Sequence, residues 1–113
     1  MTRISIKTGK QYFIFRAQGH AERKKGEDEN LICAAISILA QTLAECVQKR
    51  EKDMKAVRIR LDPGDAVISC LCDEKDSAWT SSMFEFARTG CTLLQERYPE
   101  TVQIIGGEEK KLL

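Results

Sequence analysis

The chain has 113 residues, with 18 Lys and Arg against 17 Asp and Glu, which leaves a formal net charge of +1. This length has room for one compact core, so we expect a single domain over residues 1–113 and not a multidomain enzyme. A net charge so close to zero lacks the basic excess of typical nucleic-acid-binding proteins. We therefore do not expect the function to require direct nucleic-acid binding. The net charge would not reveal a local basic patch, however.

The sequence also argues against export and against a membrane segment. The first residues alternate polar and apolar side chains, without the continuous hydrophobic stretch of a signal peptide, so we expect a cytoplasmic protein. No apolar run approaches the ~20 residues that a membrane-spanning helix needs. Five cysteines in a cytoplasmic chain favour free thiols over a disulfide framework. With a single histidine and one close cysteine pair, we expect no metal site and no cofactor.

Two hairpins are predicted in chain order. Alternation from Arg3 to Lys7, a turn at 8–10 and an aromatic, β-branched stretch over 11–17 predict the first hairpin. The polar segment 18–29 is bracketed by glycines and predicts an exposed loop. The second hairpin is predicted from alternation over 57–61, a Pro-Gly turn at 62–65 and a strand over 66–72.

Each hairpin is followed by a predicted helix. Apolar residues recur at a 3.6-residue period from Leu31 to about Glu51, with Asn30 or Asp28 as N-cap. A second helix is predicted to start at a Ser77 cap and to end before residues 98–99, and residues 101–105 form the last strand. The order ββαββαβ predicts an α+β fold in which two helices pack on a mostly antiparallel sheet.

The helical period also predicts which side of each helix faces the core. In the first helix the apolar stripe centres on Ala35, Ile38 and Thr42 and includes Cys46, which is expected to be a small core residue. In the second helix the stripe is made of Trp79, Met83, Phe86, Gly90 and Leu93 or Leu94.

Cys33 lies on the side of the first helix opposite that stripe, on a face shared with Ser37, Ala40 and Ala44. In the predicted first turn, backbone N–H groups lack intrahelical partners and the helix dipole favours negative charge, which stabilises the reactive thiolate. The same N–H groups could donate to an oxyanion. The position therefore favours Cys33 as a nucleophile.

His20 is the only histidine and lies thirteen residues before Cys33, where the second predicted strand ends. A strand end beside a helix start would bring its imidazole within hydrogen-bond reach of the sulfur, as a general base requires. A surface histidine together with an inert cysteine remains the alternative.

These residues resemble a known family. The segments Gly19-His20-Ala21 and Leu31-Ile32-Cys33-Ala34-Ala35-Ile36-Ser37 resemble the Prp family of bacterial ribosomal-processing cysteine proteases, and the resemblance continues to Tyr98-Pro99-Glu100. It implies a small homodimeric α+β endopeptidase that removes the N-terminal extension of a large-subunit ribosomal protein, number twenty-seven, through a thioester intermediate.

The resemblance also implies roles for individual residues. Cys33 would be the nucleophile, His20 the base and later the acid toward the leaving amine, and Ser37 a supporting hydrogen-bonding residue. The family usually has an aspartate shortly before the cysteine, whereas this chain has Asn30 there and Asp28 two residues earlier. Either residue would orient the imidazole, or Asn30 would only cap the helix.

The residues between His20 and the predicted helix form a candidate substrate loop. It consists of Ala21, Glu22, Arg23, Lys24, Lys25, Gly26 and Glu27. Such a charge run is either solvated surface or a mobile lid over the scissile peptide, with acidic residues that steer a basic ribosomal precursor.

Two other functions remain open at this point. One is a non-catalytic ribosome-associated binding or assembly factor with the same fold, which the departure at Asn30 would favour. The other is a thiol redox protein that uses Cys70 and Cys72, although a CxC pair alone is a weak signal.

Overall fold

The computed structural model describes residues 1–19 and 27–105, with side chains from residue 31 onward in the second range. The strands are β1 (Thr2–Thr8), β2 (Tyr12–Gln18), β3 (Met54–Asp62), β4 (Asp65–Cys72) and β5 (Val102–Ile104), and the helices are α1 (Glu27–Lys49) and α2 (Ser77–Arg97). Short 3₁₀ turns at Glu51–Asp53 and Glu74–Asp76 join α1 to β3 and β4 to α2. The predicted element order and the α+β class are confirmed.

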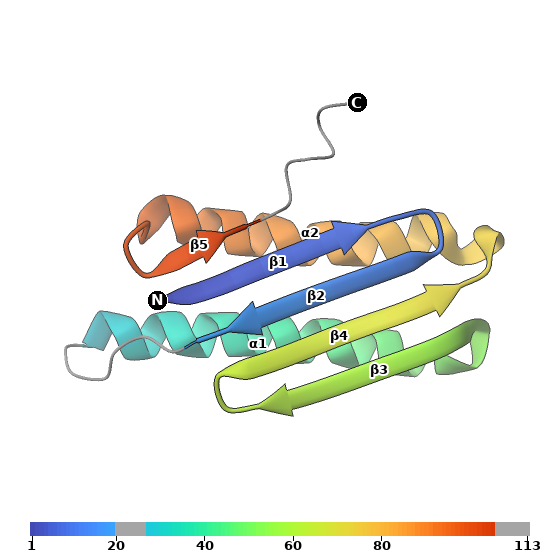
Figure 1. The fold of residues 1–113 in the computed structure, drawn as a ribbon, viewed down its shortest axis with the longest axis horizontal. Coiled ribbons are helices and arrows are strands. Elements are labelled where there is room, and N and C mark those ends of the chain that lie inside the picture. The colour runs from blue at the N-terminus through green and yellow to red at the C-terminus, as the bar shows by residue number, and fades with distance from the viewer. Residues whose placement is uncertain (20–26, 106–113) are drawn as a thin grey trace.

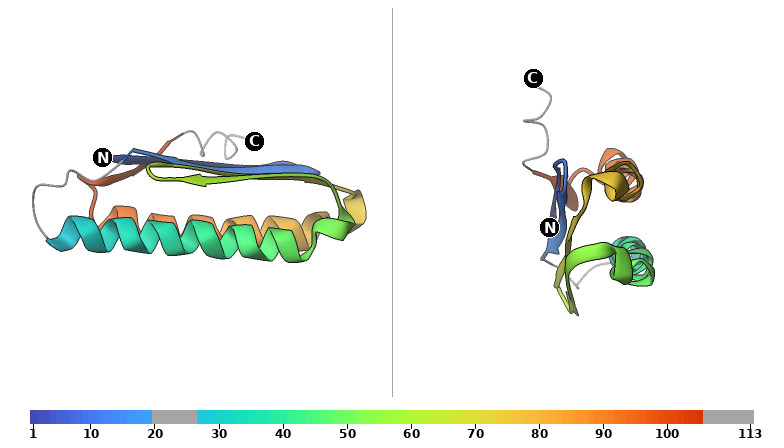
Figure 2. Two further views of the ribbon diagram at one scale, coloured as in Figure 1. Left: turned by 90° about the horizontal axis from the view of Figure 1, so that it is seen from below. Right: turned by 90° about the vertical axis from the view of Figure 1, so that its right-hand side faces the viewer.

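The strands form one sheet in the order β3-β4-β2-β1-β5. Every neighbouring pair is antiparallel except β1 and β5, which are parallel. Both helices run along the same face of the sheet (Figures 1 and 2). The end-on view in Figure 2 shows that the other face is left open by the elements of the described ranges. The molecule therefore has two layers, one of strands and one of helices.

The core lies between these two layers. Successive strand residues point to opposite sides, so Ile4, Ile6, Phe13 and Phe15 point toward the helices and are fully buried. The Phe13 ring stacks on the ring of Phe84 in α2, with 5.6 Å between the centroids.

The predicted core stripe of α1 is wrong. Ile38 is 59% exposed and Thr42 is also exposed, and the predicted core residue Cys46 is only partly buried. The side that packs on the sheet is made of Ile32, Ile36, Ala40, Leu43, Ala44 and Val47. Because α1 has apolar residues on two sides, its periodicity does not show which side meets the sheet.

The predicted core stripe of α2 is wrong in part: Trp79, Phe86 and Leu93 are exposed, whereas Met83 and Leu94 are partly buried against the core. Phe84 is fully buried, whereas Phe86 is 77% exposed. The exposed stripes of the two helices line common grooves of about 410 and 440 Å³ on the side away from the sheet. We call this apolar surface the paired-helix face, and its exposed residues are Leu31, Ile38, Trp79, Phe86 and Leu93.

The two-sided character of α1 also explains its high hydropathy. Contrary to the expectation from sequence, the stretch Leu31–Lys49 has the length and composition of a membrane-spanning helix, with a mean hydropathy of 1.6. In the structure one apolar side of this stretch packs on the sheet, and the other contributes to the paired-helix face.

Phe84 and Phe86 provide a matched test of this helix orientation. We expect Phe84→Ala to lower the free energy of unfolding by about 3–5 kcal/mol, because it leaves a cavity beside Phe13. Phe86→Ala should change the stability of the monomer by less than about 0.5 kcal/mol, because that ring is exposed. Urea unfolding at low protein concentration measures both values, and equal losses would contradict the orientation.

Candidate active site

The end of β2 and the turn between β3 and β4 lie together. Gln18 pairs with Asp65, and the Gly19 N–H donates a hydrogen bond to the Gly64 carbonyl oxygen at 3.0 Å. Gly19 has a φ of +104°, and a Cβ atom there would come within 2.4 Å of the Met1 carbonyl oxygen. Only glycine fits this position, so the bend immediately before His20 depends on it.

Cys33 faces a cavity beside this bend. The cavity has a volume of about 250 Å³ and lies between α1, the end of β2 and the β3–β4 turn; its lining includes Ala17, Gly19, Cys33, Ser37 and residues 62–66. A neighbouring cavity of about 230 Å³ shares Ser37, Ala40 and the same turn. Together they form a trough along one flank of α1, with Cys33 and Ser37 one helical turn apart in its wall.

The start of α1 differs from the prediction in a way that matters for Cys33. The helix begins at Glu27 and not near Leu31, so Asp28 and Asn30 lie inside its first turns and not in a loop or at the cap. Cys33 is the seventh helical residue, whereas only the first four N–H groups of a helix lack intrahelical partners. The Cys33 N–H is therefore not a free oxyanion donor, and the Ser37 hydroxyl is a donor that does line the cavity.

The β3–β4 turn adds two carboxylates to the site, at positions whose sequence pattern predicts only a turn. Asp62 and Asp65 both line the cavity beside Cys33. Asp65 accepts a hydrogen bond from Arg60 through Oδ2 at 2.7 Å, while its buried Oδ1 has no hydrogen-bond partner among the described residues. Such oxygens favour cationic or N–H-donating groups in the cavity. Asp62 and Asp65 could not be recognised as site residues from the sequence, because no local pattern shows that the β3–β4 turn lies next to α1.

The remaining thiols lie in other environments. Cys46 lines a groove of the paired-helix face, and Cys70, Cys72 and Cys91 are buried. Burial raises the pKa of Cys70 to about 11, with a further increase from the neighbouring Cys72. Burial also raises the pKa of Cys91 to about 12. Reactive thiols need the opposite shift, so these environments argue against a redox role for the Cys70 and Cys72 pair.

Several predicted site residues lie outside the described residues. They are His20, Ala21, Glu22, Arg23, Lys24, Lys25 and Gly26, together with the side chains of Glu27, Asp28 and Asn30. The proximity of His20 to Cys33 therefore stays a prediction. Gly19, the residue before His20, lines the same cavity as Cys33.

Comparisons with known proteins point to one family. The sequence profile of the family described as cysteine protease Prp matches residues 1–103. No curated protein sequence matches the chain. The structure of SMU.848 from Streptococcus mutans is similar, with a TM-score of 0.68 and 20% identity over 92% of this chain and 91% of that chain.

Two further structures are of the essential ribosomal processing protease Prp from S. aureus. With a substrate peptide, that protein has a TM-score of 0.68 and 12% identity, and with a covalently linked product peptide it has a TM-score of 0.69 and 14% identity. Both alignments cover 96% of this chain and 100% of that chain. At these identities the structures show a shared fold. Since the profile spans residues 1–103, the chain belongs to the cysteine protease Prp family.

Proposed function

We propose that this chain is a cytoplasmic cysteine endopeptidase that removes the N-terminal extension of a large-subunit ribosomal protein, number twenty-seven. The observation that carries this proposal is the cavity that Cys33 faces in a chain of the cysteine protease Prp family. The S. aureus relative, a ribosomal processing protease, has been solved with a substrate peptide, which supports a ribosomal precursor as the partner. The trough along α1 is the surface where we place that peptide.

The proposed reaction is acyl transfer. His20 takes the thiol proton of Cys33, and the sulfur attacks the scissile carbonyl carbon to form a tetrahedral intermediate. The C–N bond then breaks, His20 delivers the proton to the leaving amine, and a thioester remains. Water hydrolyses the thioester, which releases the carboxylate product and restores the thiol. Ser37 would donate a hydrogen bond from its hydroxyl within the same cavity.

The segment between Gly19 and α1 completes the proposed site. Asn30 precedes Cys33 by three residues in α1, the spacing of helical neighbours, which favours Asn30 over Asp28 as the residue that orients His20. The predicted substrate loop follows His20, and its last residue, Glu27, is the first residue of α1 and not part of a loop; we propose that the loop contacts the precursor. Asp62 and Asp65 both form ion pairs with Arg60, which leaves one net negative charge on the opposite wall that would attract a basic ribosomal protein.

We further propose that two copies of the chain pair through the paired-helix face. Phe86 is 77% exposed, Leu31 62% and Ile38 59%, and the grooves between them are lined almost wholly by apolar side chains. A contiguous exposed apolar surface of this kind is typical of a protein–protein interaction site. A second copy of the same helical layer would cover it and give the interface a hydrophobic centre.

The proteolytic function is tested with a peptide that spans the precursor junction. The wild-type protein should cleave it, and Cys33→Ala should abolish cleavage. Ser37→Ala should lower kcat/KM by about 10- to 100-fold if its hydroxyl donates to the developing oxyanion. Cys46→Ala is the matched thiol control and should cleave normally. Absence of cleavage by the wild type, on the peptide and on intact precursor, would favour the assembly-factor function.

Alkylation tests the nucleophile independently of the substrate. At pH 8, iodoacetamide should modify Cys33 before Cys70 and Cys91, because those two thiols are buried and have raised pKa values near 11 and 12, so they stay protonated. Mass spectrometry of the digested protein gives the order of modification. Early modification of Cys70, or a disulfide between Cys70 and Cys72 under mild oxidation, would contradict this assignment.

The paired-helix face is tested by placing a charge at its centre. Phe86→Glu should convert the dimer to a monomer in sedimentation velocity, and Arg58→Glu on the other side of the molecule should leave the dimer intact. Cys46 lines the same groove as Phe86 and should become more accessible to iodoacetamide only in the Phe86→Glu protein. A monomeric wild type would overturn this interface.

A further inference from the structure

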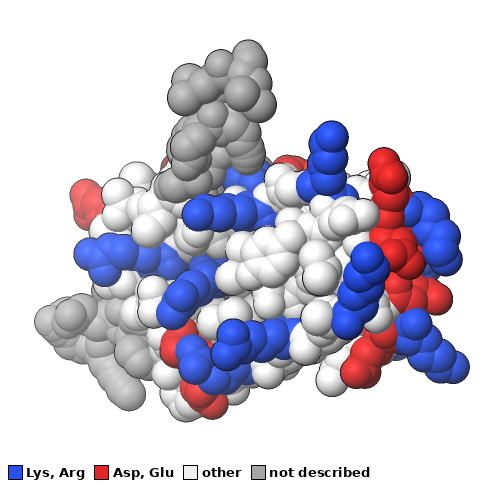
Figure 3. Space-filling model, turned by 45° about the vertical axis from the view of Figure 1, so that its right-hand side comes forward, with Lys and Arg blue, Asp and Glu red and all other residues white. Residues whose placement is uncertain are grey.

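The uncovered face of the sheet is strongly basic. Its outward positions on β1, β2 and β3 include Arg3, Lys7, Arg16, Arg58 and Arg60, all exposed, whereas the alternating inward positions form the core. We call this surface the open sheet face. Figure 3 shows Lys and Arg side chains gathered over this part of the molecule, with the acidic side chains mostly toward the edges of the view.

The strand register arranges these side chains in rows across the sheet. One row runs from Arg60 on β3 through Val67 and Arg16 to Ser5 on β1. The next row runs from Arg58 through Ser69 and Ile14 to Lys7. Each row therefore has one cation on β3 and a second cation on β1 or β2. Neighbouring strands are about 4.8 Å apart, so the basic surface is about 15 Å wide.

Most of this positive charge is not neutralised. Arg60 forms ion pairs with Asp65 at 2.7 Å and with Asp62 at 3.6 Å. Arg3, Lys7, Arg16 and Arg58 form no ion pair with the described side chains, those of residues 1–19 and 31–105. A chain with a net charge of only +1 thus holds four unpaired cations on one flat surface.

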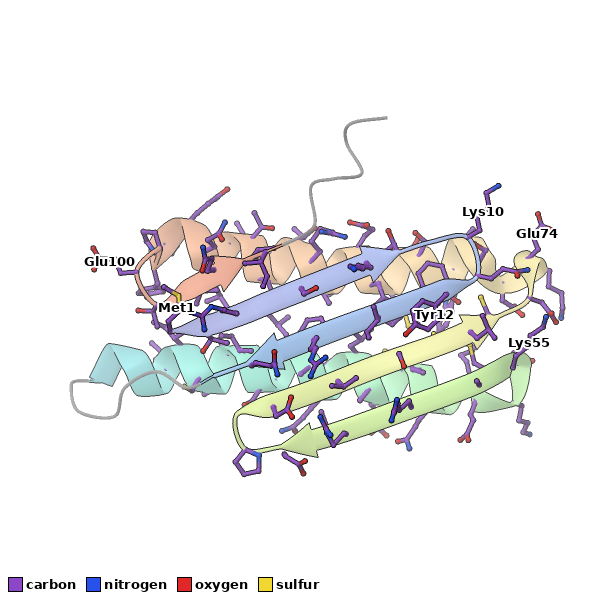
Figure 4. All side chains as sticks on the ribbon, viewed as in Figure 1. Met1, Lys10, Tyr12, Lys55, Glu74 and Glu100 are labelled. Carbon is purple, nitrogen blue, oxygen red and sulfur yellow. The ribbon has the colours of Figure 1, made fainter. Side chains whose placement is uncertain are left out.

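An aromatic ring lies on the same face. Tyr12 is at the start of β2, is 50% exposed, and is opposite Leu71 on β4. Figure 4 shows its side chain over the sheet, on the face turned away from the helices. An exposed aromatic ring on a sheet is a platform on which an unpaired base can stack.

We propose that the open sheet face binds single-stranded RNA. The unpaired cations would bind phosphates, and the Tyr12 ring would stack on a base. Binding to an anionic membrane would instead need exposed apolar side chains that insert into the lipid. The three most exposed large apolar residues, Leu31, Ile38 and Phe86, lie instead on the paired-helix face, on the opposite side of the molecule. The peptide trough is bounded by α1 and the β3–β4 turn, so RNA and precursor would occupy different surfaces. The proposal does not depend on proteolytic activity.

Fluorescence anisotropy with a labelled, unstructured RNA of about 20 nucleotides tests the proposal on the full chain. With four phosphate contacts, log K should fall with log [NaCl] with a slope of about −3. Arg16→Gln/Arg58→Gln should weaken binding about tenfold and reduce the magnitude of the slope by about 1.4. Tyr12→Leu should weaken binding at least fivefold and leave the slope unchanged, because stacking releases no counterions.

A charge-matched control separates this face from a general effect of net charge. Lys49→Gln/Lys52→Gln removes the same two charges near the end of α1 and should bind RNA like the wild type. Equal losses in the two double variants, undetectable binding at 50 mM NaCl, or tighter binding to phosphatidylserine vesicles than to RNA would overturn the proposal. Circular dichroism confirms that each variant is folded. Cleavage of the short peptide should be the same in all variants. A loss of RNA binding can therefore be distinguished from a loss of proteolysis.

Discussion

The pairing of β2 with β4 is the constraint on which the rest of the structure depends. Its register sets Phe15 opposite Ile68 and Arg16 opposite Val67. Because strand side chains alternate, a slip by one residue would turn Arg16 into the core and Phe15 out to water. The same register ends with Gln18 opposite Asp65, which brings Gly19 to the β3–β4 turn and both to the cavity beside Cys33. One strand pair thus determines the core, the open sheet face and the site.

The strands were predictable because alternation is a local signal that the pleated backbone uses directly. Ile4 and Ile6 alternate with polar residues and could be assigned to one face before any neighbour was known, and both are fully buried. The helices could be located but not oriented. Phe84 and Phe86 differ by two positions and not by hydrophobicity, and only the sheet and the second helix decide which of them is buried. A helix with two apolar sides has no preferred inner face in isolation.

The candidate site was predictable in part. Cys33 and Ser37 could be grouped because helical spacing is local, and they do line one cavity. The helix start could not be placed, because the polar segment before it has no sharp boundary signal, so Cys33 was assigned to the first turn when it lies in the second. Asp62 and Asp65 enter the site only through long-range strand pairing. The overall charge was the least informative quantity, since it averages an open sheet face rich in arginine with acidic residues elsewhere.

The separation of the two layers has a consequence for stoichiometry. If two copies meet through their helices, their sheets become the outer surfaces of a four-layer particle and point in opposite directions. Only one of the two sheets could then bind a given flat, RNA-covered surface, so dimerisation would not increase the avidity for that surface. The second sheet would remain available to a separate RNA molecule. A dimer of this shape would therefore link two RNA molecules and would not bind a single one with higher affinity.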